Sequence, residues 1–274
     1  MTRKYEMKSA VNPKVFLSWG KGLQSTTLGV MAVQGLFKLD GIITADTHWE
    51  HLYTNQIEEW YTNYFQQKGI SVYKVSGGDI QKESVEKPEV PFYTSPDGAP
   101  LRRQCTNEYK IQPCRRKIRE LIGSRADNCG RVKKGSVKFL LGISYDEAER
   151  MKDSTASYII NEFSLVDMKY TREDCTIYLE GLGLPVPRKS SCICCPYQGA
   201  ERWYDLKQNF PDDWFNVVNF DNLHRNPPEG MLKRGHDCKL YLWKKLQPLE
   251  EVNWENIIEK SDEKDICDSG YCFV

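Results

Sequence analysis

The feature that most constrains the fold is a glycine- and hydroxyl-rich loop between an apolar strand pattern and a helix pattern. The loop covers residues 18–26, Ser-Trp-Gly-Lys-Gly-Leu-Gln-Ser-Thr, and follows the apolar run Val15–Leu17. A helix pattern then runs over 26–34. Glycines let the backbone approach an anion, and the N–H groups and dipole of a first helical turn favour negative charge. This order of elements predicts a phosphate-binding loop, although a Gly/Ser turn at such a place is often only a turn.

The candidate ligand contacts share this loop: Ser18, Trp19, Gly20, Lys21, Gly22, Gln24, Ser25 and Thr26. Its hydroxyls can add donors to those of the backbone. The loop has neither the G-x-x-x-x-G-K-[ST] order nor the G-x-G-x-x-G order, so it is not one of the two common nucleotide loops.

Strand and helix patterns alternate along the first part of the chain. Strands are expected at 15–17, 39–45, 71–75 and 137–143, and helices at 26–34, 54–67 and 112–122. This alternation predicts an α/β fold with a Rossmann-like parallel sheet flanked by helices. Residues 77–101 are rich in Gly and Pro and are expected to form a mobile loop. We expect residues 1–185 to form the nucleotide-binding α/β domain and 186–274 a helical, cysteine-rich C-terminal module.

Composition narrows the setting. The 274 residues carry a formal net charge of +0, so no global basic field argues for nucleic acid. The N-terminus has no signal-peptide pattern, and no apolar run reaches the ~20 residues that span a bilayer. We therefore expect a cytoplasmic protein without membrane association. In a reducing compartment its 10 cysteines suit thiols, metal ligands or catalysts better than disulfides.

Four residues outside the loop are candidates for catalysis or substrate binding. Asp46 follows the second expected strand, where a carboxylate can hold Mg²⁺ or a nucleotide, or cap the next helix. Arg103 and Lys110 belong to a basic run that suits phosphate or sulfate oxygens, or forms a solvated face. Cys105, within that run, is a nucleophile, a persulfide carrier or a packed thiol.

Two cysteine pairs form the candidate metal centre. Cys192 and Cys195 form C-x-x-C, and Cys267 and Cys272 lie near the C-terminus. Four thiolates suit zinc or an iron–sulfur cluster, and a redox dithiol is the alternative. The roles of Cys194 and Cys238 stay open.

Several segments resemble one family. The loop resembles the PP-loop of ATP pyrophosphatases, in the S-x-G-x-G-x-Q-S-T form of phosphoadenosine-phosphosulfate (PAPS) reductase-like proteins; Gln24 stands where Asp is usual. Residues 45–50 resemble A-D-T-G-x-E, with His48 in place of Gly. Residues 103–113 resemble R-x-C-T-x-x-[FY]-K-I-x-P, and residues 141–150 resemble L-G-I-x-x-D-E-x-x-R.

The resemblance implies the adenine nucleotide alpha hydrolase fold and cleavage of ATP between its α- and β-phosphates. It places Arg103, Lys110 and Arg150 at an anionic substrate, in the same cleft as the loop; the other interpretation of Arg150 is a surface ion pair with Glu147. Mg²⁺ would neutralise the departing pyrophosphate. A [4Fe–4S] cluster on the four cysteines is expected from sulfur-transfer relatives, with Zn²⁺ as the alternative.

The implied function is an AMP-forming ATP pyrophosphatase, a hydrolase or transferase that adenylates an acceptor for sulfur transfer. The expected acceptor is nucleic acid, as in DNA phosphorothioation, reached directly or through a partner protein, with tRNA thiolation as the related activity. A cysteine desulfurase or other sulfur donor would supply sulfur, and a homodimer is left open. One alternative is a sulfonucleotide reductase or a sulfate adenylyltransferase, but the chain lacks the E-C-G-L-H motif of true PAPS reductases. The other is a non-catalytic, zinc-stapled nucleotide-binding module.

Overall fold

A five-stranded parallel sheet forms the centre of the protein. The computed structural model describes residues 12–84, 89–123, 132–233 and 237–260. The strand order is β3-β2-β1-β5-β6, and every pair of neighbours is parallel. The strands are β1 Lys14–Ser18, β2 Gly41–Asp46, β3 Val72–Ser76, β5 Val137–Leu141 and β6 Ile159–Glu162. The expected α/β fold class is therefore confirmed.

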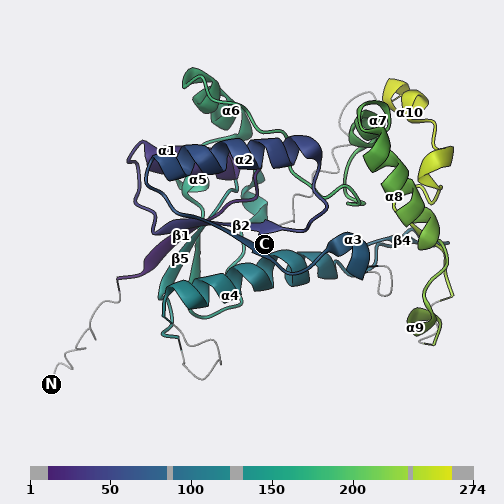
Figure 1. The fold of residues 1–274 in the computed structure, drawn as a ribbon, viewed down its shortest axis with the longest axis horizontal. Helices are drawn as coiled ribbons and strands as arrows, with labels where there is room; N and C mark the ends of the chain where they lie inside the picture. The colour runs from purple at the N-terminus through teal and green to yellow at the C-terminus, as the bar shows by residue number, and fades with distance from the viewer. Residues whose placement is uncertain (1–11, 85–88, 124–131, 234–236, 261–274) are drawn as a thin grey trace.

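The central strands are buried because helices cover both faces of the sheet (Figure 1). Successive side chains of a strand point to opposite faces. Leu17 and Ile42 accordingly belong to the core beneath α1 and α2, whereas Phe16 and Ile43 belong to the core beneath α4. Apolar side chains on both faces are typical of parallel strands of this kind.

The helices around the sheet are of two kinds. α1 Leu23–Val33, α2 Leu52–Gln67 and α4 Gln112–Leu121 lie in the connections between strands of the sheet, whereas α5 Ser164–Asp167 and α6 Arg172–Gly181 follow its last strand. In α2 the buried side chains of Thr54, Glu58, Tyr61 and Phe65 recur at helical spacing and face the core. A capping box between Thr171 and Asp174 starts α6 by satisfying its first N–H groups.

The C-terminal part is a group of helices beside the sheet (Figure 1). Its elements are α7 Ala200–Asn209, α8 Pro211–Leu223, α9 Glu229–Leu232, β7 Leu240–Tyr241, η3 Leu249–Glu251 and α10 Trp254–Lys260. One core cluster joins Trp203 and Trp254 from this part to Phe92 and Tyr109 from the first part. Because that cluster takes residues from both sides of residue 185, the division of the chain there stays a prediction.

Two expectations about local structure are wrong. Residues 77–101, expected as a mobile loop, contain α3 Ile80–Glu83 and β4 Tyr93–Thr94, and β4 pairs antiparallel with β7. Val90 and Phe92 in this segment are buried, which ties it to the core. The first helix begins at Leu23 rather than at residue 26, so the loop between β1 and α1 is shorter than expected.

The elements that the sequence analysis missed include β6 and η1. The short strand β6 at the sheet edge carries only one buried residue, so no apolar run marks it. A π-helix, η1 Thr106–Ile111, precedes α4. Such π-helical turns are rare and occur frequently at functional sites. Within the described part of the chain, no helix has the length and apolar character needed to cross a membrane.

Candidate functional site

The loop between β1 and α1 lies at the carboxyl edge of the sheet. Gly22 caps α1 and has no side chain that could accept the first-turn N–H groups of this 11-residue helix. The Ser25 hydroxyl accepts from the Gly20 N–H at 3.2 Å and donates to the Gly22 carbonyl at 3.2 Å. Ser25 therefore fixes the turn of the loop, and the positive end of the helix dipole faces outward from the sheet edge.

Trp19 and Thr26 hold the loop from the core side. The Trp19 indole N–H donates to Thr26 Oγ1 at 2.9 Å, and both residues are fully buried. The Trp19 ring meets Phe65 of α2 edge-on, with ring centroids 5.5 Å apart. These two predicted ligand contacts therefore have side chains that pack inside the protein.

Lys21 also turns inward. Its backbone is left-handed, with φ 62°, and its side chain is 2% exposed. The ammonium donates to the Ala45 carbonyl at 3.0 Å and lies 3.5 Å from Glu58 Oε2 and 3.7 Å from Glu50 Oε1. Lys21 thus joins the loop to β2 and α2 through buried ion pairs.

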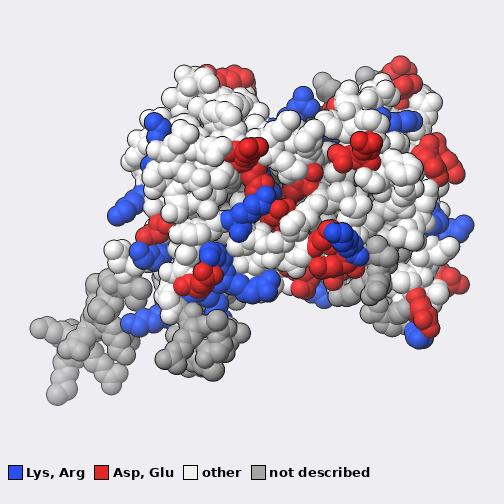
Figure 2. Space-filling model, viewed as in Figure 1, with Lys and Arg blue, Asp and Glu red and all other residues white. Residues whose placement is uncertain are grey.

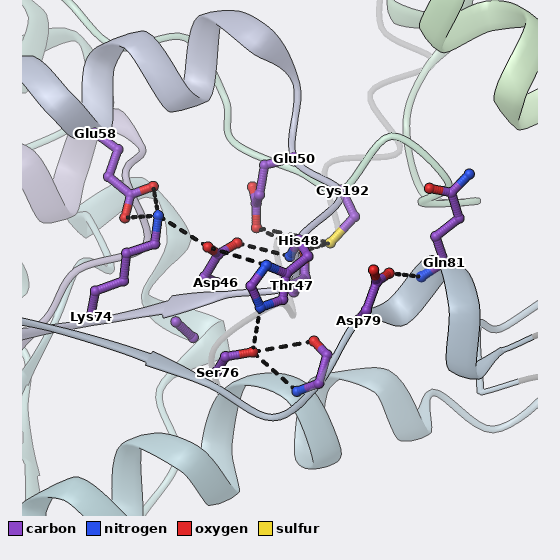
Figure 3. Close-up of polar contacts among 12 residues, drawn as sticks. Asp46, Thr47, His48, Glu50, Glu58, Lys74, Ser76, Asp79, Gln81 and Cys192 are labelled. Atoms are coloured by element: carbon purple, nitrogen blue, oxygen red, sulfur yellow. Dashed lines mark hydrogen bonds and ion pairs between the residues drawn. The ribbon is translucent and has the colours of Figure 1, made fainter.

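The ion pairs continue to the end of β2 (Figure 3). The Lys74 ammonium lies 3.3 Å from Glu58 Oε1 and 3.0 Å from Asp46 Oδ2. Burial opposes ionisation of Asp46, but the hydrogen bond from the His48 N–H and the Lys74 charge outweigh it and lower its pKa. Burial likewise opposes ionisation of Glu50, and Lys21 and Lys110 outweigh it, so the pKa of Glu50 is also lowered. Asp46 and Glu50 are therefore anionic at neutral pH.

His48 explains one departure from the family pattern. It adopts φ 59°, the left-handed region that favours glycine, so the backbone turn that Gly would make is kept. Its ring bonds Ser76 Oγ at 2.9 Å, while His51 stacks on Tyr53. Asp46 alone supplies one carboxylate, and Mg²⁺ would need phosphate oxygens as further ligands. The magnesium-binding role of Asp46 therefore stays a prediction.

On the opposite side of the loop, Gln24 joins two further segments. Its amide donates to Glu147 Oε2 at 3.1 Å and accepts from Arg172 at 3.4 Å. Arg150 Nη1 lies 2.5 Å from the same Glu147 oxygen, and its buried Nε has no hydrogen-bond partner among the described residues. The Glu147–Arg150 pair is thus partly buried against the loop. Among the described residues, the Nε–H group of Arg150 makes no hydrogen bond and could donate to a ligand.

Gly142 lets β5 approach the loop closely. A Cβ on Gly142 would lie 2.6 Å from the backbone N and 2.8 Å from the Cα of Ser25. Only a residue without a side chain fits there, which gives the glycine of the L-G-I motif a physical reason.

The segment 188–192 covers the loop from the C-terminal half of the sequence. The Ser190 hydroxyl donates to the Gly20 carbonyl at 2.5 Å, and a β-bridge joins Glu50 to Cys192. Cys192 Sγ lies 3.2 Å from Thr47 Oγ1. Sequence analysis missed Ser190 and Glu58, because their partners lie far away in the chain and no local pattern marks such a contact. Glu50 entered it only as the last residue of the A-D-T-G-x-E segment, without a role.

The basic run divides. Lys110 is buried, lies 4.0 Å from Glu50 Oε1, and lines a cavity that also reaches Ser18. The Arg103 guanidinium instead lies over the Tyr197 ring, 5.5 Å from its centroid. The structure therefore brings Lys110 and Arg150 to the loop, and the contact it gives Arg103 is with the C-terminal part.

A second cavity lies beside η1. Its lining includes Glu83, Glu89 and Glu108, with Arg116 of α4 as the cation. Figure 2 shows acidic side chains over α3 and basic ones over α4.

Several of the described cysteines lie in or against the C-terminal core cluster, and Cys195 donates its backbone N–H to the Cys192 carbonyl at 3.1 Å. Cys192 and Cys194 are buried in one core cluster, and Cys105 and Cys238 pack against it. Burial, followed by the neighbouring Cys192 and Cys105, raises the pKa of Cys194. Cys267 and Cys272 lie outside the described residues. Within those residues no three His, Cys, Asp or Glu side chains are grouped to hold a metal, so the cluster stays a prediction.

The strand order changes direction between β1 and β5, and the loop stands at that point, where open α/β sheets bind ligands. Fold and loop thus define a Rossmann-like α/β protein with a candidate anion site. No family model and no curated protein matches the chain.

Among solved structures, the chain is similar to a phosphoadenylyl-sulfate (PAPS) reductase from Candida auris in a phosphate complex, with 17% identity over 64% of this chain and 75% of that one and a TM-score of 0.44. It is also similar to the U34-tRNA thiolase NcsA from Methanococcus maripaludis with its [4Fe-4S] cluster, with 15% identity over 77% of this chain and 72% of that one and a TM-score of 0.38.

Proposed function

We propose that the protein is an ATP pyrophosphatase that cleaves ATP between the α- and β-phosphates to activate an acceptor for sulfur transfer. The observation that carries the proposal is the α1 N-terminus, capped by Gly22 without a side-chain acceptor, at the point where the strand order changes direction. Such a helix end offers N–H groups and a dipole to phosphate oxygens. Arg150, with its spare donor beside Gln24, would add a cation to the same anion.

The sequence resemblance supports the finer part of the proposal. It favours a nucleic acid acceptor, as in DNA phosphorothioation, and a cysteine desulfurase as sulfur source. Asp46, held anionic by His48 and Lys74, would hold Mg²⁺ together with ATP phosphates; Mg²⁺, when bound, supplies charge neutralisation for pyrophosphate. Cys192 lies next to Thr47 and Glu50, near the loop, which supports a sulfur-handling role for this thiol.

The test is the affinity for α,β-methylene-ATP, measured by calorimetry. Ser25→Ala removes the hydroxyl that joins Gly20 to Gly22, and we expect its affinity to fall about tenfold or more, as for loss of a hydrogen bond near a charged group. Ser157→Ala, at an exposed position, is the matched control and should bind like wild type. Equal affinity of the wild type, Ser25→Ala and Ser157→Ala would show that the loop does not take part in nucleotide binding.

A further inference from the structure

A cavity of about 320 Å³ adjoins the loop on the side of β5 and β6. Ser18, the last residue of β1, and Leu141, the last residue of β5, both line it and are register partners in the sheet. The cavity therefore opens where the strand order changes direction, next to the first residue of the loop.

The lining has two chemical parts. Phe139, Leu141 and Ile159 from β5 and β6 give it an apolar floor. Lys110, Arg115 and Lys152 supply cations, and Asp153 is the one acid among the described lining residues. An apolar floor with an aromatic ring suits a planar base, and guanidinium and ammonium groups suit phosphate.

A hydrogen bond fixes Arg115 at the rim of this cavity, which Lys152 and Thr155 also line. Arg115 Nη2 donates to Thr155 Oγ1 at 2.8 Å, which joins α4 to the 152–155 loop across the cavity. The guanidinium has further N–H donors beyond the one used by Thr155.

We propose that this cavity binds one nucleotide of a single-stranded nucleic acid acceptor, with the base on Phe139 and the phosphate at Arg115 and Lys152. The inference rests on the proposed function, because it places the acceptor beside the loop that holds ATP. An inorganic sulfate would need neither the apolar floor nor a space of this size, so the cavity favours a nucleic acid acceptor over sulfate.

The experiment titrates a single-stranded DNA pentanucleotide, and the RNA of the same sequence, into the full chain. Each titration is made with and without saturating α,β-methylene-ATP. Arg115→Glu should weaken binding of the preferred oligonucleotide at least about tenfold and leave the affinity for the ATP analogue within about twofold. Arg116→Glu is the matched control: it is the next residue of α4, makes the same charge change, and lines the acidic cavity instead. It should change neither affinity.

Lys152→Glu, at an exposed position, tests the same rim if Arg115→Glu does not fold. Wild-type protein that binds the ATP analogue but neither oligonucleotide would overturn the inference and leave the proposed function standing. So would an equal loss in both Arg variants, or competition between the oligonucleotide and the ATP analogue for one site. If the oligonucleotide binds in a way that depends on Arg115 but the ATP analogue does not bind at all, the cavity is still a nucleic acid site. The proposed function as an ATP pyrophosphatase would then be wrong.

Discussion

The two sides of the phosphate-binding loop differ in how their charges are used. On the β2 side, the charges of Lys21, Glu50, Glu58 and Lys74 are paired with one another, and only Lys74 is substantially exposed. On the β5 side, a cavity of about 320 Å³ is lined by cations that include Arg115. Paired charges out of water fix a structure, whereas charges on an open rim can meet a ligand. We infer that the paired charges of the closed side hold the loop in shape and that the open side admits the acceptor.

The largest effect should come from the closed side. Lys21→Met keeps the side-chain length but removes the cation that Glu50 and Glu58 share, which leaves Glu50 with Lys110 at 4.0 Å and Glu58 with the half-exposed Lys74. We expect the free energy of unfolding to fall by about 3 kcal/mol, the lower end for a broken buried pair, because both carboxylates keep a second cation. Urea denaturation measures it. Lys233→Met, which breaks an exposed pair with Glu229, should cost less than about 1 kcal/mol.

Adding Glu58→Gln to Lys21→Met sharpens this test. If uncompensated carboxylates cause the loss, the double variant should be more stable than Lys21→Met alone, because one unpaired charge is removed. A fully additive loss would mean that Lys21 acts through packing rather than charge.

The free energy of unfolding should also depend on pH, through His51. Burial, aided by the Arg202 charge, lowers the pKa of His51, at the start of α2, from 6.5 to about 4. Between these two pH values the unfolded state binds a proton at His51 and the folded state does not. The contribution of His51 to the free energy of unfolding is therefore fully present above pH 6.5 and is lost as the pH falls towards 4. The difference amounts to roughly 3 kcal/mol.

Denaturant titrations at pH 7.5 and pH 4.5 check the assignment. His51→Asn should lose stability less steeply on acidification than wild type. Gln56→Asn, at an exposed position of the same helix and without a titratable group, should keep the wild-type dependence. Identical pH dependence in all three proteins would show that His51 is not held neutral.

A smaller effect is expected where the open side meets the loop. Gly142→Ala would force a Cβ against the backbone of Ser25, and we expect a loss of about 1–3 kcal/mol together with weaker binding of the ATP analogue. Gly181→Ala, where a Cβ would meet nothing within 4 Å at the end of α6, should be neutral or slightly stabilising. Thermal melting and calorimetry separate the two outcomes, and unchanged binding in Gly142→Ala would mean that the loop tolerates the displacement.

The smallest effect on stability should come from the open rim. Arg115→Glu should change the free energy of unfolding by no more than about 0.5 kcal/mol, because the side chain is partly exposed and makes one hydrogen bond to Thr155. A loss as large as that of Lys21→Met would erase the distinction between the two sides.

The sequence predicted the parts of this site that local patterns encode. The apolar runs of β1 and β2, the loop between β1 and α1, and Asp46 at a strand end all follow from composition and spacing. The inward turn of Lys21 does not, because it depends on Glu50 and Glu58, which lie in another part of the sequence. The hydrogen bond from Ser190 to the Gly20 carbonyl could not be predicted either, because the two residues are 170 positions apart in the sequence. The π-helix η1 was missed because residues 106–111 were interpreted only as part of the basic run, and a helix was expected only from residue 112.

The most direct test of the central claim is the product of ATP cleavage. The full-length protein is incubated with α-labelled ATP, Mg²⁺ and the single-stranded oligonucleotide that it binds, and the labelled products are separated. We predict label in AMP or in an adenylated oligonucleotide, with pyrophosphate released and the signal lost in Ser25→Ala. Label in ADP with release of orthophosphate, or turnover that Ser25→Ala leaves unchanged, would contradict the account.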